Sequence, residues 1–218
     1  MPKLDDYSEL LEALGPHGRE MVQSTWLEAT RSFDPAGLTR YLQGAREIAT
    51  AGLGWSVMLA YLRETPAIAR QAGAMGAARM IDVALTIYAR TDARTTELVF
   101  SSGLVAARHL RDHTLFSAYL DFLCELAESA PAGIAPILNR LDSLLEQLSL
   151  DGLRRWAMLG VQSHMRDPAA QARYFQLDSV EGRSLLQAEG DQTVFADVER
   201  RMSLYLRALW GREMKLRP

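Results

Sequence analysis

The sequence lacks several features that would define its chemistry or its compartment. It has one cysteine, Cys124, which excludes an internal disulfide and a multi-cysteine metal site. Its first residues contain no apolar run typical of a signal peptide, and its longest nearly apolar run, residues 51–62, is too short to span a bilayer. We therefore expect a cytoplasmic protein without a membrane span, in which Cys124 is a small buried residue.

The motifs of common catalytic sites are also missing. The sequence contains no Gly-x-x-x-x-Gly-Lys-Ser/Thr phosphate loop, no Gly-x-Ser-x-Gly turn and no His-Glu-x-x-His pair. The formal net charge of -3 gives no basic footprint for nucleic acid. We expect a protein that is not an enzyme, binds no cofactor and has no nucleic-acid partner.

The histidines are the strongest candidates for a reactive or metal-binding site in this sequence. His109 and His113 would share one side of a continuous helix, but a metal site needs at least one further ligand, and the chain around Asp112 can break the helix between them. We favour one histidine at a helix end and one capping histidine over a metal site. His164 falls on an apolar face and is interpreted as a core residue.

Apolar residues recur at helical spacing along almost the whole chain. The stripes occupy residues 38–49, 55–62, 80–87, 116–127, 134–148, 153–164 and 195–209. No window alternates apolar and polar residues in the way a half-buried strand does. The sequence therefore predicts an all-α fold without strands.

Three dipeptides mark expected helix starts. Asp34-Pro35, Thr65-Pro66 and Asp167-Pro168 each place a capping side chain before a proline. Proline suits the first helical position because its missing N–H has no partner there in any case.

Helices of similar length joined by short loops must lie antiparallel to their neighbours. We predict a single helical domain over 1–218. Within it, helix pairs of about 40 residues over 36–166 form a HEAT- or armadillo-like stack, and 167–218 form a C-terminal helical extension with a long terminal helix. The sequence of Leu59–Leu62 is loosely similar to that of Ser117–Leu120, as expected of two copies of one repeat. Small residues in 101–107 predict a closely packed inner helix.

One surface combines arginine with methionine. Six residues lie on or beside the side of a predicted helix opposite its apolar stripe: Arg154, Arg155, Met158, Gln162, Met165 and Arg166. Exposed Met with Arg is a common composition of a protein-binding strip. The alternative is that Met158 and Met165 pack under the next layer of helices. Trp156 and Trp210 are predicted core residues.

The C-terminal third resembles a known family. The residues that carry the resemblance lie in 150–167, 170–177, 195–201 and 204–212, and include the run Tyr205-Leu206-Arg207-Ala208-Leu209-Trp210-Gly211. These stretches resemble the N-terminal helical region of CbbO/NorD-type proteins, which carry a von Willebrand factor A domain further along the chain. More loosely, the resemblance extends back to Leu4-Asp5-Asp6-Tyr7 and covers most of the sequence.

The resemblance implies a non-catalytic adaptor or scaffold for a MoxR-type AAA+ ATPase hexamer. In this family the ATPase supplies force, and the adaptor directs it to a client enzyme through the von Willebrand factor A domain. That domain holds a metal with Asp-x-Ser-x-Ser, which this sequence lacks. We therefore expect no metal ligands here, and a von Willebrand factor A domain downstream of Pro218.

Two clients are associated with the family: Rubisco, and nitric oxide reductase. The short N-terminus reads like the Rubisco-activating branch, so a CbbO-type component of a Rubisco activase is the favoured function. A NorD-type activator of nitric oxide reductase is the alternative within the family. A stand-alone helical-repeat binding module with an unrelated partner is the alternative outside it.

Overall fold

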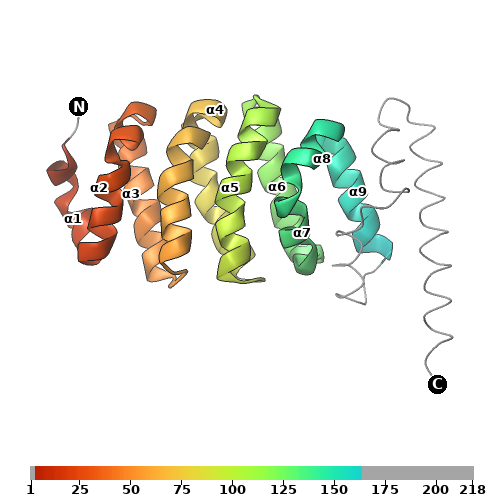
Figure 1. The fold of residues 1–218 in the computed structure, drawn as a ribbon, viewed down its shortest axis with the longest axis horizontal. Coiled ribbons are helices and arrows are strands. Elements are labelled where there is room, and N and C mark those ends of the chain that lie inside the picture. Colours follow the sequence, from red (N-terminus) through yellow and green to blue (C-terminus); the bar gives the residue numbers. More distant parts are fainter. Residues whose placement is uncertain (1–2, 164–218) are drawn as a thin grey trace, which may run out of the picture. The chain divides into compact units, whose positions relative to one another are not determined.

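Helices account for the regular structure of residues 3–163, the part of the chain that the computed structural model describes (Figure 1). No strand occurs among these residues, so the predicted all-α helical stack is confirmed. The chain divides into two compact units after Glu128. The predicted subdivision between 166 and 167 and the predicted long C-terminal helix lie outside the described residues.

The N-terminal unit contains helices α1 to α6. A short 3-10 turn at Leu4–Tyr7 leads into α1, and the unit then continues through five longer helices. Their bounds are α1 Ser8–Glu12, α2 Gly15–Ser32, α3 Pro35–Thr50, α4 Trp55–Tyr88, α5 Ala93–Leu110 and α6 His113–Ser129. Helix α2 lies before residue 36, so helical packing begins earlier than the predicted start of the stack.

Helix α4 is really two helices joined by a sharp break at Gly73. Gly73 has φ 80° and ψ 160°, a left-handed backbone conformation that favours glycine. The first half, residues 55–72, and the second half, residues 74–88, therefore form an antiparallel pair (Figure 1).

The predicted helix start at Thr65-Pro66 was wrong, because both residues are buried inside α4. Pro66 has no N–H to donate to the carbonyl of Leu62, four residues earlier. The hydroxyl of Tyr41 on α3 donates to that carbonyl instead, at 2.7 Å. A tertiary hydrogen bond thus replaces the missing helical one and lets the helix continue. Asp34-Pro35 does begin a helix as predicted: the Asp34 carboxylate accepts from the backbone N–H of Gly37 at 2.7 Å.

A spacing of 39 residues relates successive helix pairs in this unit. Arg40 on α3 lies 3.6 Å from Asp82 on α4, and Arg79 lies 2.6 Å from Asp121 on α6, so the same ion pair recurs 39 positions along. Buried positions recur at the same spacing: Val22, Tyr61 and Phe100; Ala29, Ile68 and Ala107; Leu42, Ile81 and Leu120. The echo between Leu59–Leu62 and Ser117–Leu120 does not fit this spacing, because those segments belong to different helices of a pair.

Aromatic rings link the layers of the N-terminal unit. Phe33, Tyr41, Tyr61 and Phe100 form successive ring contacts with centroids 5.4–5.5 Å apart. The Tyr61 hydroxyl donates to the backbone carbonyl of Tyr41 at 2.9 Å. Burial raises the pKa of both tyrosines above the usual range, so both hydroxyls stay protonated and serve as structural donors.

Small residues allow α5 to approach α4, as the sequence predicted. Gly103, Ala106 and Ala107 are buried, and a Cβ at Gly103 would collide with Met80. Ser101, in contrast, is exposed.

The described part of the C-terminal unit is a shorter helical segment. A 3-10 turn at Pro131–Gly133 precedes α7 Ile134–Asn139, α8 Leu141–Gln147 and α9 Leu150–Ser163. Leu141, Leu144 and Leu148 are buried, and α8 packs on α9.

Candidate protein-binding surface

Helix α9 carries the predicted binding residues, and its N-terminus is fixed by a side-chain cap. The Ser149 hydroxyl accepts from the backbone N–H of Gly152 at 3.1 Å. Leu153, Trp156 and Ala157 are buried on one side of the helix, with Trp156 only 4% exposed. The prediction that Trp156 is a core residue is confirmed, and its burial sets which side of α9 faces outward.

Arg154 and Arg155 lie on the exposed side of α9. The guanidinium of Arg155 is 4.0 Å from the Asp151 carboxylate one turn earlier, and both side chains are largely exposed. Met158 is half-buried, between the two alternatives that the sequence left open. The structure therefore brings two arginines and a partly accessible methionine together on one helix.

The remaining predicted site residues are less completely described. Gln162 belongs to α9, but its side chain is outside the description. Met165, Arg166, His164 and Trp210 lie outside the described residues, so their roles stay predictions.

The two histidines that could have shared a metal lie on different helices. His109 is in the last turn of α5, and Arg111, with φ 48°, ends that helix before His113 begins α6. The Nδ1 atom of His113 lies 2.6 Å from the carbonyl oxygen of Ala72, at the end of the first half of α4. The interpretation of one helix-end and one capping histidine is confirmed.

Other reactive groups in the described part of the chain occupy structural positions. Cys124 is half-buried rather than fully buried, and desolvation raises the pKa of its thiol. Within residues 3–163, no group of three or more His, Cys, Asp or Glu side chains is placed to hold a metal ion. None of the helices in the same range has the length and apolar character that a membrane span requires.

Several large apolar side chains outside the predicted binding surface are exposed. Leu27 on α2 and Trp55 and Leu59 on α4 are large apolar side chains that are 37–54% exposed. The predicted apolar stripe over 55–62 included Trp55 and Leu59, and the structure instead leaves both side chains exposed.

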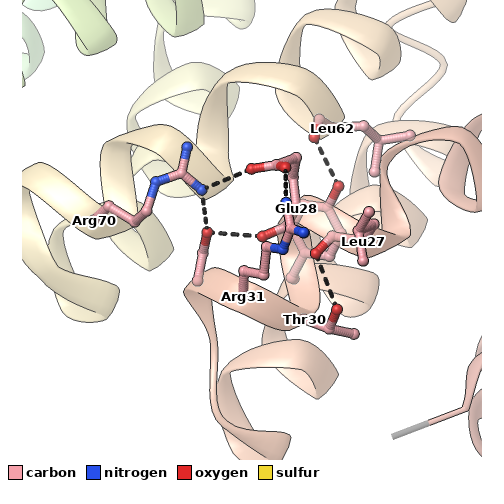
Figure 2. Close-up of polar contacts among 8 residues, drawn as sticks. Leu27, Glu28, Thr30, Arg31, Leu62 and Arg70 are labelled. Carbon is pink, nitrogen blue, oxygen red and sulfur yellow. Dashed lines mark hydrogen bonds and ion pairs between the residues drawn. The ribbon is translucent and has the colours of Figure 1, made fainter. Parts of the chain in front are cut away.

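Arginines and one shared carboxylate lie close to Leu27. Figure 2 shows Arg70 reaching from α4 to Glu28 on α2, with Arg31 on the other side of the same carboxylate. The Glu28 oxygens lie 3.1 Å from Arg70 and 3.0 Å from Arg31, and Arg70 also donates to the Ser32 hydroxyl at 2.7 Å. This network ties α2 to α4, so its first role is structural.

The sequence matches no protein-family model, and no curated protein or solved structure is significantly similar to it. The class of this protein is therefore defined by its architecture. It is an all-helical protein whose N-terminal unit repeats a helix pair every 39 residues.

Proposed function

We propose that this chain is a non-catalytic adaptor region that docks on a MoxR-type AAA+ ATPase hexamer. The resemblance of residues 150–212 to CbbO/NorD-type proteins nominates the partner. The architecture supports the general role, because stacked helix pairs present long surfaces to other proteins and need no catalytic residues.

The exposed side of α9 is the docking surface in this proposal. The observation that carries it is the burial of Trp156, which places Arg154 and Arg155 on the exposed side of the helix. Arginine forms bidentate pairs with carboxylates, and a partly accessible methionine adds adaptable apolar contact. An acidic surface on the ATPase would complement this side of α9.

Charge reversal of the two arginines tests the surface. In the full-length adaptor, Arg154→Glu with Arg155→Glu should weaken co-purification with the ATPase at least about tenfold, a change of about 1.4 kcal/mol. The melting temperature should stay close to that of wild type, because both side chains are exposed and the Arg155–Asp151 pair lies at the surface.

A matched control separates a local effect from a general change of charge. Arg46→Glu with Arg63→Glu makes the same change at two exposed arginines of α3 and α4, and it should leave assembly unchanged. Full assembly of the α9 variant would exclude this surface. Equal weakening by both variants would show an unspecific charge effect.

Deleting residues 1–218 from the full-length adaptor tests the role of the whole region. The proposal expects loss of ATPase binding, and unchanged binding would refute it. The chain on its own is also expected to hydrolyse no ATP, because its sequence contains no phosphate loop. An ATPase assay on purified chain checks this directly.

The client remains the Rubisco branch in this proposal, with nitric oxide reductase as the alternative. The adaptor should release inhibited Rubisco in the presence of the ATPase and ATP. Failure with Rubisco, together with restored activity of nitric oxide reductase, would move the protein to the NorD branch. Failure with both clients and with the ATPase would favour an independent helical-repeat binding module.

A further inference from the structure

The helices of the N-terminal unit form two layers that carry opposite charge. One layer contains α2, the first half of α4 and α5, and the other contains α3, the second half of α4 and α6 (Figure 1). The first layer has six arginines and four glutamates, whereas the second has three arginines and five aspartates or glutamates. The first layer is therefore positive and the second negative, although the whole chain has a formal net charge of -3.

Helix α2 and the first half of α4 lie side by side in the positive layer and run in the same direction. Near the beginning of both helices, the His17 ring lies 4.7 Å from the Trp55 ring, and toward their ends Glu28 lies 3.1 Å from Arg70. The boundary between them is therefore about 20 Å long, at a rise of about 1.5 Å per residue (Figure 1).

Exposed apolar side chains occur on both helices of this boundary. Trp55 is 49% exposed, and Leu59, one turn later on α4, is 37% exposed. Leu27, in the second half of α2, is 54% exposed. The other large exposed apolar side chains of the described residues, Met75 and Leu115, lie in the first turns of helices in the negative layer. The positive layer thus combines arginine with apolar surface that a partner can cover.

The polar network at the end of the boundary keeps an excess of positive charge. One carboxylate, that of Glu28, lies between the guanidinium groups of Arg31 and Arg70 (Figure 2). Among the described residues, the bonds of these arginines to Glu28 and Ser32 use only the Nη1 atom of each guanidinium. Arginine has five N–H donors, so both exposed side chains can donate to a further carboxylate.

We propose that the face formed by α2 and the first half of α4 binds an acidic amphipathic helix of a partner protein. Apolar side chains of that helix cover Leu27, Leu59 and Trp55, and its carboxylates pair with Arg31 and Arg70. Docking of an amphipathic helix through its apolar face is a common mode of peptide recognition.

The glutamates of the positive layer favour a peptide over an anionic membrane. Carboxylates of a peptide can lie opposite single arginines and away from the four glutamates, whereas a uniformly anionic surface would meet both. The inference uses the N-terminal unit alone and does not depend on the proposed docking of the ATPase on α9.

Two synthetic peptides test the chemistry of the partner. One is a helical peptide of about 16 residues, long enough to match the boundary, with leucines on one face and glutamates beside them. The other has lysine in place of every glutamate. Fluorescence anisotropy with the full chain should show at least about tenfold tighter binding of the glutamate peptide. Equal binding of the two peptides, or no binding of the glutamate peptide, overturns the proposal.

Leu27→Ala and Arg70→Gln test the surface. Each should weaken binding of the glutamate peptide at least about fivefold, because each removes a side chain that the peptide contacts. Leu115→Ala and Arg46→Gln make the same changes at exposed side chains of the negative layer and should leave binding unchanged. Leu27→Ala should also melt like wild type, because its side chain is exposed, so its loss of binding is separate from unfolding.

Unchanged binding by Leu27→Ala, or equal weakening by Leu115→Ala, overturns the proposed surface. Vesicles of phosphatidylcholine and phosphatidylserine provide the remaining test. Binding to these vesicles that Arg70→Gln abolishes, without binding of the glutamate peptide, would assign the face to a membrane and overturn the proposal.

Discussion

The N-terminal unit contains two junctions between neighbouring helices. The two junctions share the same arrangement of helices and differ in the side chains that pack between them. The first junction joins α3 to the second half of α4, and the second joins that half to α6. Each has a glycine against an aromatic ring, Gly37 against Phe33 and Gly76 against Phe116, and each is crossed by an Arg–Asp pair with the same spacing. The glycine, the ring contact and the ion pair are thus the features that the two junctions repeat.

The bulky ring changes position between the two junctions. Phe33 lies against Gly37 in the first, while its equivalent at 39 positions is Ala72. Phe116 lies against Gly76 in the second, while its equivalent is Ala77. One ring contacts the glycine in each case, although it comes from a different helix. This exchange shows that packed volume is maintained even where the identity of each residue is not.

Phe116→Ala should have the largest effect on stability. It places an alanine in the second junction where the first has Ala77, but the second junction has Ala72 in place of Phe33 and so has no other ring to fill the space. Phe116 is fully buried, so the free energy of unfolding should fall by about 3–5 kcal/mol in urea denaturation. Adding Ala72→Phe should recover part of the loss by supplying the ring from the other side. A loss below about 1 kcal/mol would mean that this ring is not needed.

Leu115→Ala is the control for that experiment. Leu115 is the neighbouring residue and is 44% exposed, so its truncation should change stability by no more than about 0.5 kcal/mol.

Tyr41→Phe should weaken the packing of α3 on the first half of α4 by about 1–3 kcal/mol, because the buried carbonyl of Leu62 loses the donor that Tyr41 supplies. Tyr119, the equivalent residue of α6, has a longer contact of 3.4 Å to the Ser102 hydroxyl. Tyr119→Phe should therefore cost less. Both losses are measurable by chemical denaturation at one temperature.

Pro66→Ala sharpens the interpretation of Tyr41→Phe. Alanine restores a backbone N–H that can bond the Leu62 carbonyl, so Tyr41→Phe should cost less in the Pro66→Ala background. Equal costs in both backgrounds would show that the Tyr41 hydroxyl does not compensate for the proline.

Acid should weaken the helix pair that begins with Asp92. The backbone N–H of Thr95 donates to the Asp92 carboxylate at 2.7 Å and lowers the pKa of that carboxyl. A depressed folded pKa contributes stability above the usual Asp pKa of about 3.9, and that stability is lost as pH falls through the folded value. Asparagine is also a good N-cap residue but does not ionise. Asp92→Asn therefore keeps the cap and removes its dependence on pH.

The stability difference between wild type and Asp92→Asn should therefore be larger at pH 6 than at pH 2.5. Urea denaturation at the two pH values measures it. A difference that does not change with pH would show that the carboxylate charge adds nothing to the cap.

The Arg–Asp pairs should have the smallest effects. Both arginines are partly exposed, so each pair is expected to contribute no more than about 1 kcal/mol. The Arg79–Asp121 distance of 2.6 Å is shorter than the 3.6 Å between Arg40 and Asp82. Double-mutant cycles should therefore give stronger coupling in the second junction, and stronger coupling in the first would contradict the expected order.

Local chemistry predicted some helix boundaries and misassigned others. Asp34-Pro35 begins α3 because the cap and the proline act within one turn. Thr65-Pro66 has the same local signature but lies inside α4, where Tyr41, 24 positions earlier than Thr65, satisfies the freed carbonyl. No reading of the local sequence includes that donor. The break at Gly73 depends equally on its neighbour, because His113 from α6 contacts the end of that helix.

The candidate surface was partly predictable for a related reason. The stripe containing Leu153 and Trp156 predicted which side of α9 is buried, and so placed Arg154 and Arg155 outside. It could not decide between the exposed and buried alternatives for Met158, because the outcome depends on how neighbouring chain covers the helix edge. Trp55 and Leu59 were predicted in the apolar stripe over 55–62 but are exposed, because exposure depends on how neighbouring helices pack.

The sequence by itself determined the helical class, the buried side of helices such as α3 and α6, and the caps that act within one turn. These follow from side-chain spacing and from hydrogen bonds between residues three or four positions apart. Only the tertiary structure decided the 39-residue registration, the donor that lets α4 run through Pro66, and the exposure of Trp55 and Leu59. Each of these depends on atoms brought together from distant segments, where volume and hydrogen-bond satisfaction are settled jointly rather than residue by residue.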